Sequence, residues 1–549
     1  MTVLIAMALA ISSFAANPNY VVGSSNTVTA DPRVPRPNEK PCVVPLFSML
    51  AFEDFTPKTF QYTPAPDCVG PWQKVVFVGN FSVTAGIQFD RTGNIFLGNT
   101  AIYFGTTAEP SPTLSPFWHV ETDVTDYTPL FETAQTGTVN LGNLVDSTYT
   151  GIIYGSAELQ FYPLTSTPPE RHPFDAVLPL NSSPGTATLS TSTDTLSQTF
   201  TTLPMNIRRA YLDVYAQSQS SDEFWYTCVP DDVASELQSC PGTAYREGEV
   251  SIDGQPAGVA PIFPWIYTGG IDPYLWFPLP GVQTLNFVPA RVDLTPFAGM
   301  LSDGQPHTVS LSVFNADNYF SVASTLLLIE DKSVAEVSGA VTSNNLSGTP
   351  TPTVTEKLNT DPDGNITGTV SVTSNRNYSI SGYVETDKGR VDTTVAQNIA
   401  FSNVQTFDIT SAVYVQDIAQ STTINSTTTQ VDAAGTKVVT GLTRYPLTVD
   451  INFVSNPDGT FSQTTGIHQE NHVESTTTEN GTQTYHSVRN NSVAPTDTLE
   501  FDPNFNLIGN TGQSSQQHYF FNDSDGVCYD LTLTAANNVL TGVKNGCTK

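Results

Sequence analysis

Two acidic clusters beside aromatic residues are the clearest sign of chemistry in this sequence. The first contains Asp90 and Arg91, and the second contains Asp222 and Glu223 close to Trp225. Carboxyl groups can activate a water molecule and protonate a leaving group, and aromatic rings can stack on sugar faces. The two clusters therefore indicate hydrolysis of a sugar-linked bond. A structural role stays open as the alternative, because a lone carboxyl in a β protein often caps a turn or is solvated.

Several of the few arginines lie near these clusters. A fixed guanidinium can orient a carboxylate or stabilise a developing oxyanion, so Arg91 and Arg246 join Asp90 and Glu223 as candidate catalytic residues. In a regular strand Asp90 and Arg91 would point to opposite faces, so we expect a strand end or bulge there. The candidate substrate-binding residues are Asp222, Trp225, Glu247, Trp118 and Trp276.

The sequence shows no motif for a metal ion or a nucleotide cofactor. His468 and His472 form the closest histidine pair, but no cysteine or carboxylate pattern accompanies them. The spacings C-x-x-C, H-E-x-x-H and G-x-S-x-G and the dinucleotide fingerprint are absent. Since carboxyl groups and a guanidinium can supply both proton transfer and charge stabilisation, we expect no metal and no cofactor.

Composition narrows the class of protein. The chain has 549 residues, of which 39% are hydrophobic and 13% charged, and its net charge is −31. An acidic chain of this kind is not expected to bind nucleic acid or anionic membranes. Complete protonation of the carboxyls would leave a modest positive charge, which suggests tolerance of acid. A sparsely charged surface that simply suits an extracellular setting is the alternative.

The N-terminus and the cysteines point to export. Residues 1–16 form an apolar run that ends in small residues and resembles a secretory signal peptide, and no later stretch is long and apolar enough to span a membrane. Residues 17–45 are polar and proline-rich, as in an N-terminal extension. Six cysteines fall into close pairs, from whose proximity we predict the disulfides Cys42–Cys68, Cys228–Cys240 and Cys528–Cys547, although other pairings stay open.

The pattern along the chain predicts an all-β protein. Short stretches with strand propensity alternate with Gly, Pro, Asn and Asp breaks, and long helical periodicity is absent. A weak repeat places an acidic-aromatic cluster before a D-[VL]-T-x-[YF] motif twice, the motif falling at 123–127 and 293–297. We therefore expect related β-sandwich domains at 46–180 and 181–331. Residues 332–549 form a third, antiparallel β region, with two subdomains left open.

The segments around the acidic clusters resemble the peptide N-glycosidase A family, whose members are glycoamidases. The resemblance covers about residues 45–331. It rests on the segments 88–91, 107–110, 118 with 123–125, 222–226, 245–247, 266–270 and 272–276.

This resemblance implies two adjacent eight-stranded jelly rolls with an active cleft between them. The implied reaction is hydrolysis of the amide bond between asparagine and the innermost N-acetylglucosamine of an N-glycan. Asp90, held ionised and with a depressed pKa by Arg91 or Arg246, would activate water, and Glu223 would position that water or protonate the departing nitrogen. A further acid is expected near Asn143 or Asp146.

The expected partner is an N-glycopeptide or N-glycoprotein, and the enzyme is expected to be a secreted monomer active at acidic pH. Two other functions remain open at this point. One is a secreted carbohydrate-binding or adhesion protein, and the other is a glycosidase that uses two carboxyls on a glycosidic oxygen.

Overall fold

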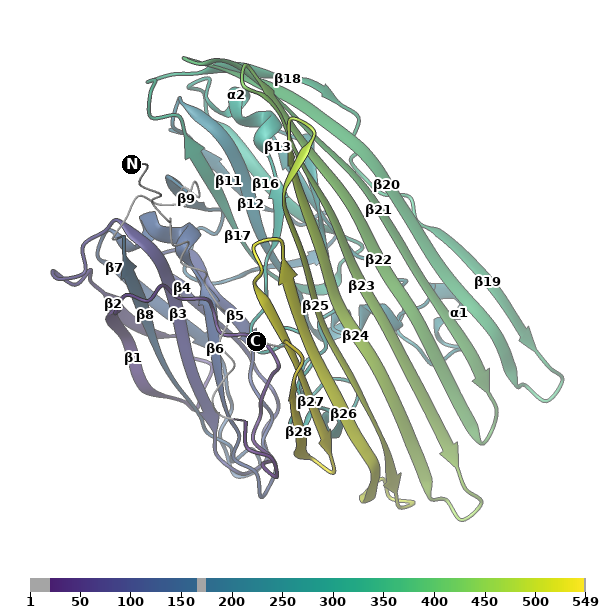
Figure 1. Cartoon of the computed structure of the whole chain (residues 1–549). Helices are drawn as coiled ribbons and strands as arrows, with labels where there is room; N and C mark the ends of the chain where they lie inside the picture. The colour runs from purple at the N-terminus through teal and green to yellow at the C-terminus, as the bar shows by residue number, and fades with distance from the viewer. Residues whose placement is uncertain (1–19, 165–173, 548–549) are drawn as a thin grey trace, which may run out of the picture.

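The computed structural model of the chain describes residues 20–164 and 174–547. Strands dominate this part of the chain, and its helices are short turns, so the all-β prediction is confirmed (Figure 1). The predicted signal peptide at 1–16 lies outside the described residues. Within the described ranges, no helix is long and apolar enough to cross a membrane.

Eight antiparallel strands form the first sandwich, drawn in purple and blue in Figure 1. Its two sheets share one core, to which Phe77 and Ile95 contribute from opposite sheets. One sheet has the order β1 (Cys42–Phe52), β8 (Ile153–Pro163), β3 (Trp72–Val83), β6 (Phe117–Asp123). The other has the order β2 (Lys58–Tyr62), β7 (Gln135–Leu141), β4 (Thr92–Leu97), β5 (Thr100–Thr106).

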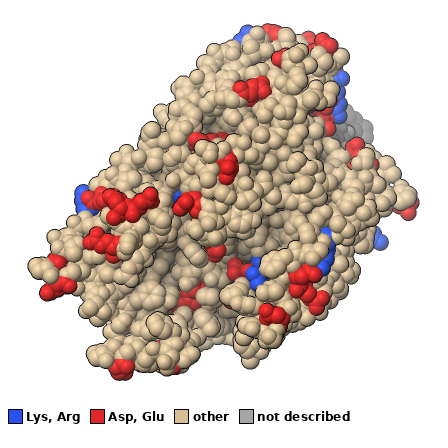
Figure 2. Space-filling model, turned by 180° about the vertical axis from the view of Figure 1, so that it is seen from behind, with Lys and Arg blue, Asp and Glu red and all other residues tan. Residues whose placement is uncertain are grey.

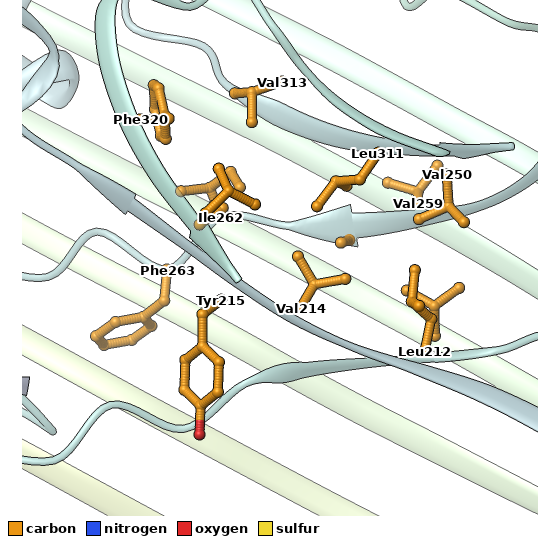
Figure 3. Close-up of a cluster of buried hydrophobic side chains, with 14 of the residues drawn as sticks. Leu212, Val214, Tyr215, Val250, Val259, Ile262, Phe263, Leu311, Val313 and Phe320 are labelled. Atoms are coloured by element: carbon orange, nitrogen blue, oxygen red, sulfur yellow. The ribbon is translucent and has the colours of Figure 1, made fainter. Parts of the chain in front are cut away.

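The second sandwich has the same connectivity. One sheet has the order β10 (Ala187–Thr191), β17 (Asp317–Glu330), β12 (Ile207–Ser218), β15 (Ala290–Asp293), with β9 (Ala176–Pro179) also paired to β17. The other has the order β11 (Leu196–Phe200), β16 (His307–Phe314), β13 (Glu247–Ile252), β14 (Gln255–Pro261). Counted from β10, the strands follow the order 1-8-3-6 and 2-7-4-5, as in the first sandwich. Aliphatic and aromatic side chains of both sheets fill the space between them (Figure 3).

The sequence repeat falls on equivalent places of the two sandwiches. In each, the D-[VL]-T-x-[YF] motif ends the sixth strand and begins a 3-10 turn, η1 (Thr125–Phe131) or η5 (Thr295–Phe297). The Asp123 carboxylate accepts a hydrogen bond from the Thr125 N–H at 3.1 Å, and Asp293 does the same for Thr295 at 3.0 Å. The repeat therefore reflects one turn used twice.

Residues 338–545 form one large antiparallel sheet, which we call the C-terminal sheet; no division into two subdomains is present in the described part of this region. Its longest strands, such as β21, have 21 residues and span roughly 70 Å at the usual rise per residue. The strands are β18 (Ser338–Asn344), β19 (Thr353–Thr360), β20 (Ile366–Thr386), β21 (Gly389–Ile409), β22 (Val413–Asp432), β23 (Gly435–Ser455), β24 (Phe461–Glu479), β25 (Thr482–Phe501), β26 (Leu507–Asp523), β27 (Cys528–Ala536) and β28 (Val539–Asn545).

One face of the C-terminal sheet packs on the second sandwich. Along the middle of β20 and β21 buried and exposed residues alternate, as expected for a sheet with one covered face. Phe401 and Leu447 of this sheet belong to the same buried cluster as Val259 of the second sandwich. The third region therefore extends the core of the second sandwich.

The predicted N-terminal extension is part of the packed structure. Residues 20–41 carry no strand, yet Val28 and Ala30 are buried with Leu531 and Leu533 of β27. The Ala30 N–H donates to Gln517 at 2.8 Å. The segment thus ties the last strands of the C-terminal sheet to the first sandwich, which lies beside them in Figure 1.

The three predicted disulfides are formed, between Cys42 and Cys68, Cys228 and Cys240, and Cys528 and Cys547. Each closes a short segment of chain, and cross-links of this kind restrict the unfolded ensemble. The Cys228–Cys240 disulfide lies in the segment that follows the candidate catalytic residue Glu223, and it constrains that segment.

Candidate active site

A cleft of 550 Å³ lies between the two sandwiches. The loop between the third and fourth strands of each sandwich reaches it. In the first sandwich this is the short loop (84–91), which brings Asp90 and Arg91, and in the second it is the long loop (219–246), which brings Glu223. The structure therefore unites the two acidic clusters of the sequence. A face of the molecule with a hollow, and with acidic residues more prominent than basic ones, is shown in Figure 2.

Asp90 and Arg91 immediately precede β4, outside any regular strand, so the expected irregularity is confirmed. The Arg91 N–H donates to Thr107 Oγ1 at 2.8 Å, and the Thr107 N–H donates to the Arg91 carbonyl at 2.9 Å. These bonds fix the end of the short loop, which allows both neighbouring side chains to line one cleft.

Glu109 is a third carboxyl at this place, and the sequence alone gave it no role. It follows β5, the hairpin partner of β4, so the hairpin returns it to the side of Asp90. Both carboxyls border Gly269, where an added Cβ would collide with Asp90 Oδ1 and lie 2.7 Å from Glu109 Oε2. Only a residue without a side chain leaves room for both acids.

All three carboxyls hold their protons more tightly than usual. Burial raises the pKa of Asp90 to about 6, although the Gly269 N–H and Arg91 oppose this. Burial and the charge of Asp90 raise the pKa of Glu109 to about 8 and that of Glu223 to about 7. The expectation of a depressed pKa at Asp90 is therefore wrong, because the loss of solvation outweighs the effect of the guanidinium.

Polar and aromatic neighbours hold the Arg91 side chain. Its Nη2 donates to Gln88 at 2.8 Å and its Nε to Asn143 Oδ1 at 3.4 Å. The rings of Phe55 and Phe89 lie 5.9 Å and 5.8 Å from the guanidinium carbon, within the range of cation–π attraction. Phe55, which lines the cleft, is 65% exposed and Phe89 is 52% exposed, so both rings are accessible to a ligand.

Neither residue suggested as a further acid fills that place. Asn143 is fully buried, donates to the carbonyls of Phe52 and Gly151, and positions Arg91. Asp146 is exposed and caps its own turn by accepting the Thr148 N–H at 2.7 Å. Glu109 is the additional acid beside Asp90.

Arg246 is paired with Asp222, and it does not hold Asp90. The Arg246 Nη2 lies 2.9 Å from Asp222 Oδ1, and both side chains are buried. The other oxygen of Asp222 accepts the N–H groups of Asp317 and Tyr319 at 2.9 Å and 3.0 Å. This pair ties both ends of the long loop to the start of β17, so the two residues act on Glu223 indirectly.

The C-terminal sheet also holds the long loop. Three amide side chains on β21 and β22 donate to successive backbone carbonyls just after Glu223. The bonds run from Asn403 to Tyr226 at 2.9 Å, from Gln416 to Thr227 at 3.1 Å and from Gln405 to Cys228 at 2.8 Å. The amides also bond to one another and are buried, and we call these three residues the amide ladder.

The remaining predicted substrate-binding residues lie away from the cleft surface. Glu247 is buried against Tyr245 and lies 3.4 Å from the Arg376 guanidinium. Trp118, Trp225 and Trp276 are 3%, 1% and 2% exposed. The prediction that these three rings stack on sugars is therefore wrong, because such large apolar rings are buried here and fill the hydrophobic core.

The buried tryptophans instead support the site from behind. Trp276 donates its indole N–H to the Gly270 carbonyl at 2.9 Å and so steadies the segment that contains Gly269. Trp225 lies against Phe401 of the C-terminal sheet, and Trp118 stacks on Phe81 inside the first sandwich.

Direct bonds hold the two sandwiches together around the cleft. Gln217 and Gln219 of the second sandwich both donate to the Thr92 hydroxyl at 2.8 Å, and the Thr106 N–H donates to the Thr284 carbonyl at 2.8 Å. Because these bonds flank Asp90, they fix the separation of the two acidic loops. Over the described residues, no set of three or more His, Cys, Asp or Glu side chains is arranged to hold a metal ion.

The fold and the site define an all-β protein with a carboxyl-lined cleft between two sandwiches of equal connectivity. The chain belongs to the peptide N-acetyl-beta-D-glucosaminyl asparaginase amidase A family, whose sequence pattern it matches over residues 36–346.

A curated relative and several solved structures are similar to this chain. Peptide-N4-(N-acetyl-beta-glucosaminyl)asparagine amidase A of Prunus dulcis is 32% identical over 397 residues, which are 67% of this chain and 68% of the relative. PNGase F, a glycosylasparaginase from Flavobacterium meningosepticum, aligns with a TM-score of 0.36 at 14% identity, over 53% of this chain and 96% of that one. PNGF-II aligns with a TM-score of 0.35 at 12% identity, over 53% of this chain and 66% of that one.

Proposed function

We propose that this protein is a glycoamidase that hydrolyses the amide bond between asparagine and the innermost N-acetylglucosamine of N-glycans. The observation that carries the proposal is the meeting of Asp90, Glu109 and Glu223 beside Arg91 at the junction of the two sandwiches. Family membership supports the substrate, since the family and its Prunus dulcis member are named for this amide bond.

In the proposed first step, Asp90 removes a proton from a water molecule. The water oxygen forms a bond to the side-chain carbonyl carbon of the substrate asparagine, and the carbonyl oxygen gains negative charge. The Arg91 guanidinium, held by Gln88 and Asn143, stabilises that charge. Exposed Phe55 and Phe89 replace the buried tryptophans as the rings that contact a sugar.

In the second step, Glu223 in its protonated form gives its proton to the departing nitrogen as the carbon–nitrogen bond breaks. The products are a peptide with aspartate and a glycosylamine, which releases ammonia in water. Glu109 keeps its proton while Asp90 is ionised, because its pKa of about 8 is higher than the value of about 6 at Asp90. A protonated Glu109 avoids a second negative charge beside the base.

This division of roles predicts the pH dependence. Asp90 must be ionised, which favours pH above about 6, and Glu223 must be protonated, which favours pH below about 7. We therefore propose a bell-shaped profile with its maximum at weakly acidic pH. The disulfides fit an oxidising compartment, which supports secretion of the protein. We also propose that the protein is a monomer and that it acts on N-glycopeptides or N-glycoproteins.

A product analysis tests the proposal. A defined N-glycopeptide is incubated with the protein across acidic to neutral pH, and the products are weighed by mass spectrometry. We expect the complete glycan to be released and the former asparagine to become aspartate. Cleavage between two sugars would indicate a glycosidase, and binding without turnover would indicate a carbohydrate-binding protein.

A further inference from the structure

A second cavity of 650 Å³ lies on the other side of the long loop from the cleft. Ser220 lines both this cavity and the cleft, and Gly269, which borders Asp90 and Glu109, lines the second cavity. The second cavity therefore shares a wall with the cleft, and none of Asp90, Glu109 and Glu223 lines it. Its volume falls within the range of about 300–1,000 Å³ that is usual for ligand sites.

The outer wall of this cavity is the C-terminal sheet. Ile451 and Phe453 on β23 and Gln463 on β24 line it, together with Gln416 on β22. In the strand register Gln416 pairs with Ile451, and Gln463 pairs with Phe453, so the four side chains share one face of the sheet. The inner wall is made by Phe224, Thr227 and Ser239 of the long loop.

The chemistry of the walls fits an uncharged, hydroxyl-rich ligand. Among the described residues that line the cavity, Asp317 is the one charged side chain. Most of the others have hydroxyl, amide or aliphatic side chains or are the rings of Phe224 and Phe453, and Cys240 contributes its disulfide. Rings and amides are the groups that contact the faces and hydroxyls of sugars. An extended peptide would instead pair with a free strand edge, but β22, β23 and β24 are interior strands with both edges paired.

Backbone strain marks the same place. Ser220 has φ +54° and Ile271 has φ +63°, and the branched side chain of Ile271 makes this conformation unfavourable. Both residues line the second cavity. Strained residues of this kind gather at ligand sites, where the surrounding structure maintains them.

We propose that the second cavity binds the outer sugars of the N-glycan, beyond the two N-acetylglucosamines of its core, while the cleft holds the amide bond. This inference rests on the proposed function. It gives the C-terminal sheet a direct role in substrate recognition, through Phe453 and its neighbours on β22 to β24.

The test uses the full chain, the variant Phe453→Ala and two substrates with the same peptide. One substrate carries only the two core N-acetylglucosamines, and the other carries a complete oligosaccharide. Phe453→Ala is expected to lower kcat/KM about tenfold for the complete glycan, by loss of one aromatic contact, and to leave the short substrate unchanged. Val454→Ala, at the next position on β23 and on its opposite face, is the matched control and should leave both unchanged.

Equal losses on both substrates, or no loss on either, would overturn the inference. A third substrate carries the complete oligosaccharide on a shorter peptide. If the loss caused by Phe453→Ala depended on peptide length and not on the glycan, the cavity would bind the peptide and the inference would be wrong. Cleavage of neither substrate by the unaltered chain would instead count against the proposed function. In that case titration with the free oligosaccharide still decides, since Phe453→Ala should raise its Kd about tenfold and an unchanged Kd would refute the site.

Discussion

The short and long acidic loops occupy the same place in sandwiches of equal connectivity, but they are held in different ways. The short loop is fixed within its own sandwich, where Gln88 donates to the carbonyls of Leu144 and Gly151. The long loop carries a disulfide and a buried ion pair, and its backbone carbonyls accept hydrogen bonds from the amide ladder of the C-terminal sheet. The loop that carries the candidate base Asp90 is therefore held mainly by its own sandwich, although the Asp90 carboxyl also accepts the Gly269 N–H of the second sandwich. The loop that carries Glu223 depends in addition on the C-terminal sheet, which lies far away in the sequence.

The largest effect is expected when either loop loses its carboxyl. Asp90→Asn and Glu223→Gln should each lower kcat by about 10²–10⁴-fold, the range for loss of a general acid or base. Glu223→Gln should also remove the fall in rate above pH about 7, because that limb reports deprotonation of Glu223. Asp146→Asn, in an exposed turn of the first sandwich, is the control and should keep the full rate. Retention of most of the rate by Asp90→Asn would refute its role.

Removing the buried ion pair between Arg246 and Asp222 tests how much this pair stabilises the long loop. Arg246→Met leaves the Asp222 carboxylate buried without its partner, which should lower the free energy of unfolding by about 3–5 kcal/mol. Arg390→Met breaks an exposed ion pair with Asp392 and should leave the free energy of unfolding almost unchanged. Urea unfolding measures both. Equal small losses would show that the buried pair is not what fixes the loop.

The amide ladder separates stability from positioning. Gln405→Leu leaves the Cys228 carbonyl without its donor, which should cost about 1–3 kcal/mol and lower kcat. Gln517→Leu is the matched control: Gln517 is equally buried in the same sheet but holds Ala30 in the N-terminal segment. It should destabilise the protein similarly and leave kcat and its pH profile unchanged. If the two variants lowered kcat alike, the ladder would have no specific link to Glu223.

The smallest expected effect concerns pH and the contact between the sheet and the site. Asp497 on β25 lies beside Asp272, which caps the turn η4 (Pro273–Trp276), and burial together with this neighbouring charge raises the pKa of Asp497. Burial likewise raises the pKa of Asp31 to about 6. A carboxyl whose pKa is raised by folding stabilises the folded state at low pH, and this contribution is lost as pH rises through the folded value.

Thermal unfolding should therefore occur a few degrees higher at pH 5 than at pH 8. Asp497→Asn keeps a donor toward Asp272 without adding a second charge, so it should reduce this difference, mainly by raising Tm at pH 8. Asp417→Asn, at a carboxyl of the same sheet not paired with Asp272, is the comparison. A Tm that rises from pH 5 to pH 8 would contradict the predicted direction of the pH dependence of stability.

The sequence was sufficient to predict the all-β class, the disulfides and the candidate residues Asp90 and Glu223. Strand propensity and turn residues are local, and cysteine pairs close in sequence formed the predicted bonds. Glu109 was missed because its partnership with Asp90 depends on the return of the β4–β5 hairpin. The partner of Arg246 was misjudged for a similar reason, since Asp222 reaches it only after the long loop closes.

Burial was the other property that local patterns could not supply. Trp118, Trp225 and Trp276 have the side chains of sugar-binding residues, but whether such a ring faces a cleft or a core depends on the packing of several sheets. The raised pKa of Asp90 follows from the same burial. The role of the C-terminal sheet depends on contacts between residues far apart in sequence, such as Asn403 with the Tyr226 carbonyl.

The position of the bond that breaks shows directly whether this protein is a glycoamidase. A glycopeptide is cleaved in water enriched in heavy oxygen, and the peptide product is analysed by mass spectrometry. We expect the former asparagine to become aspartate with one heavy oxygen in its carboxyl group. We also expect Asp90→Asn and Glu223→Gln each to slow the appearance of this product. A released glycan beside a peptide that keeps an unlabelled asparagine would contradict it.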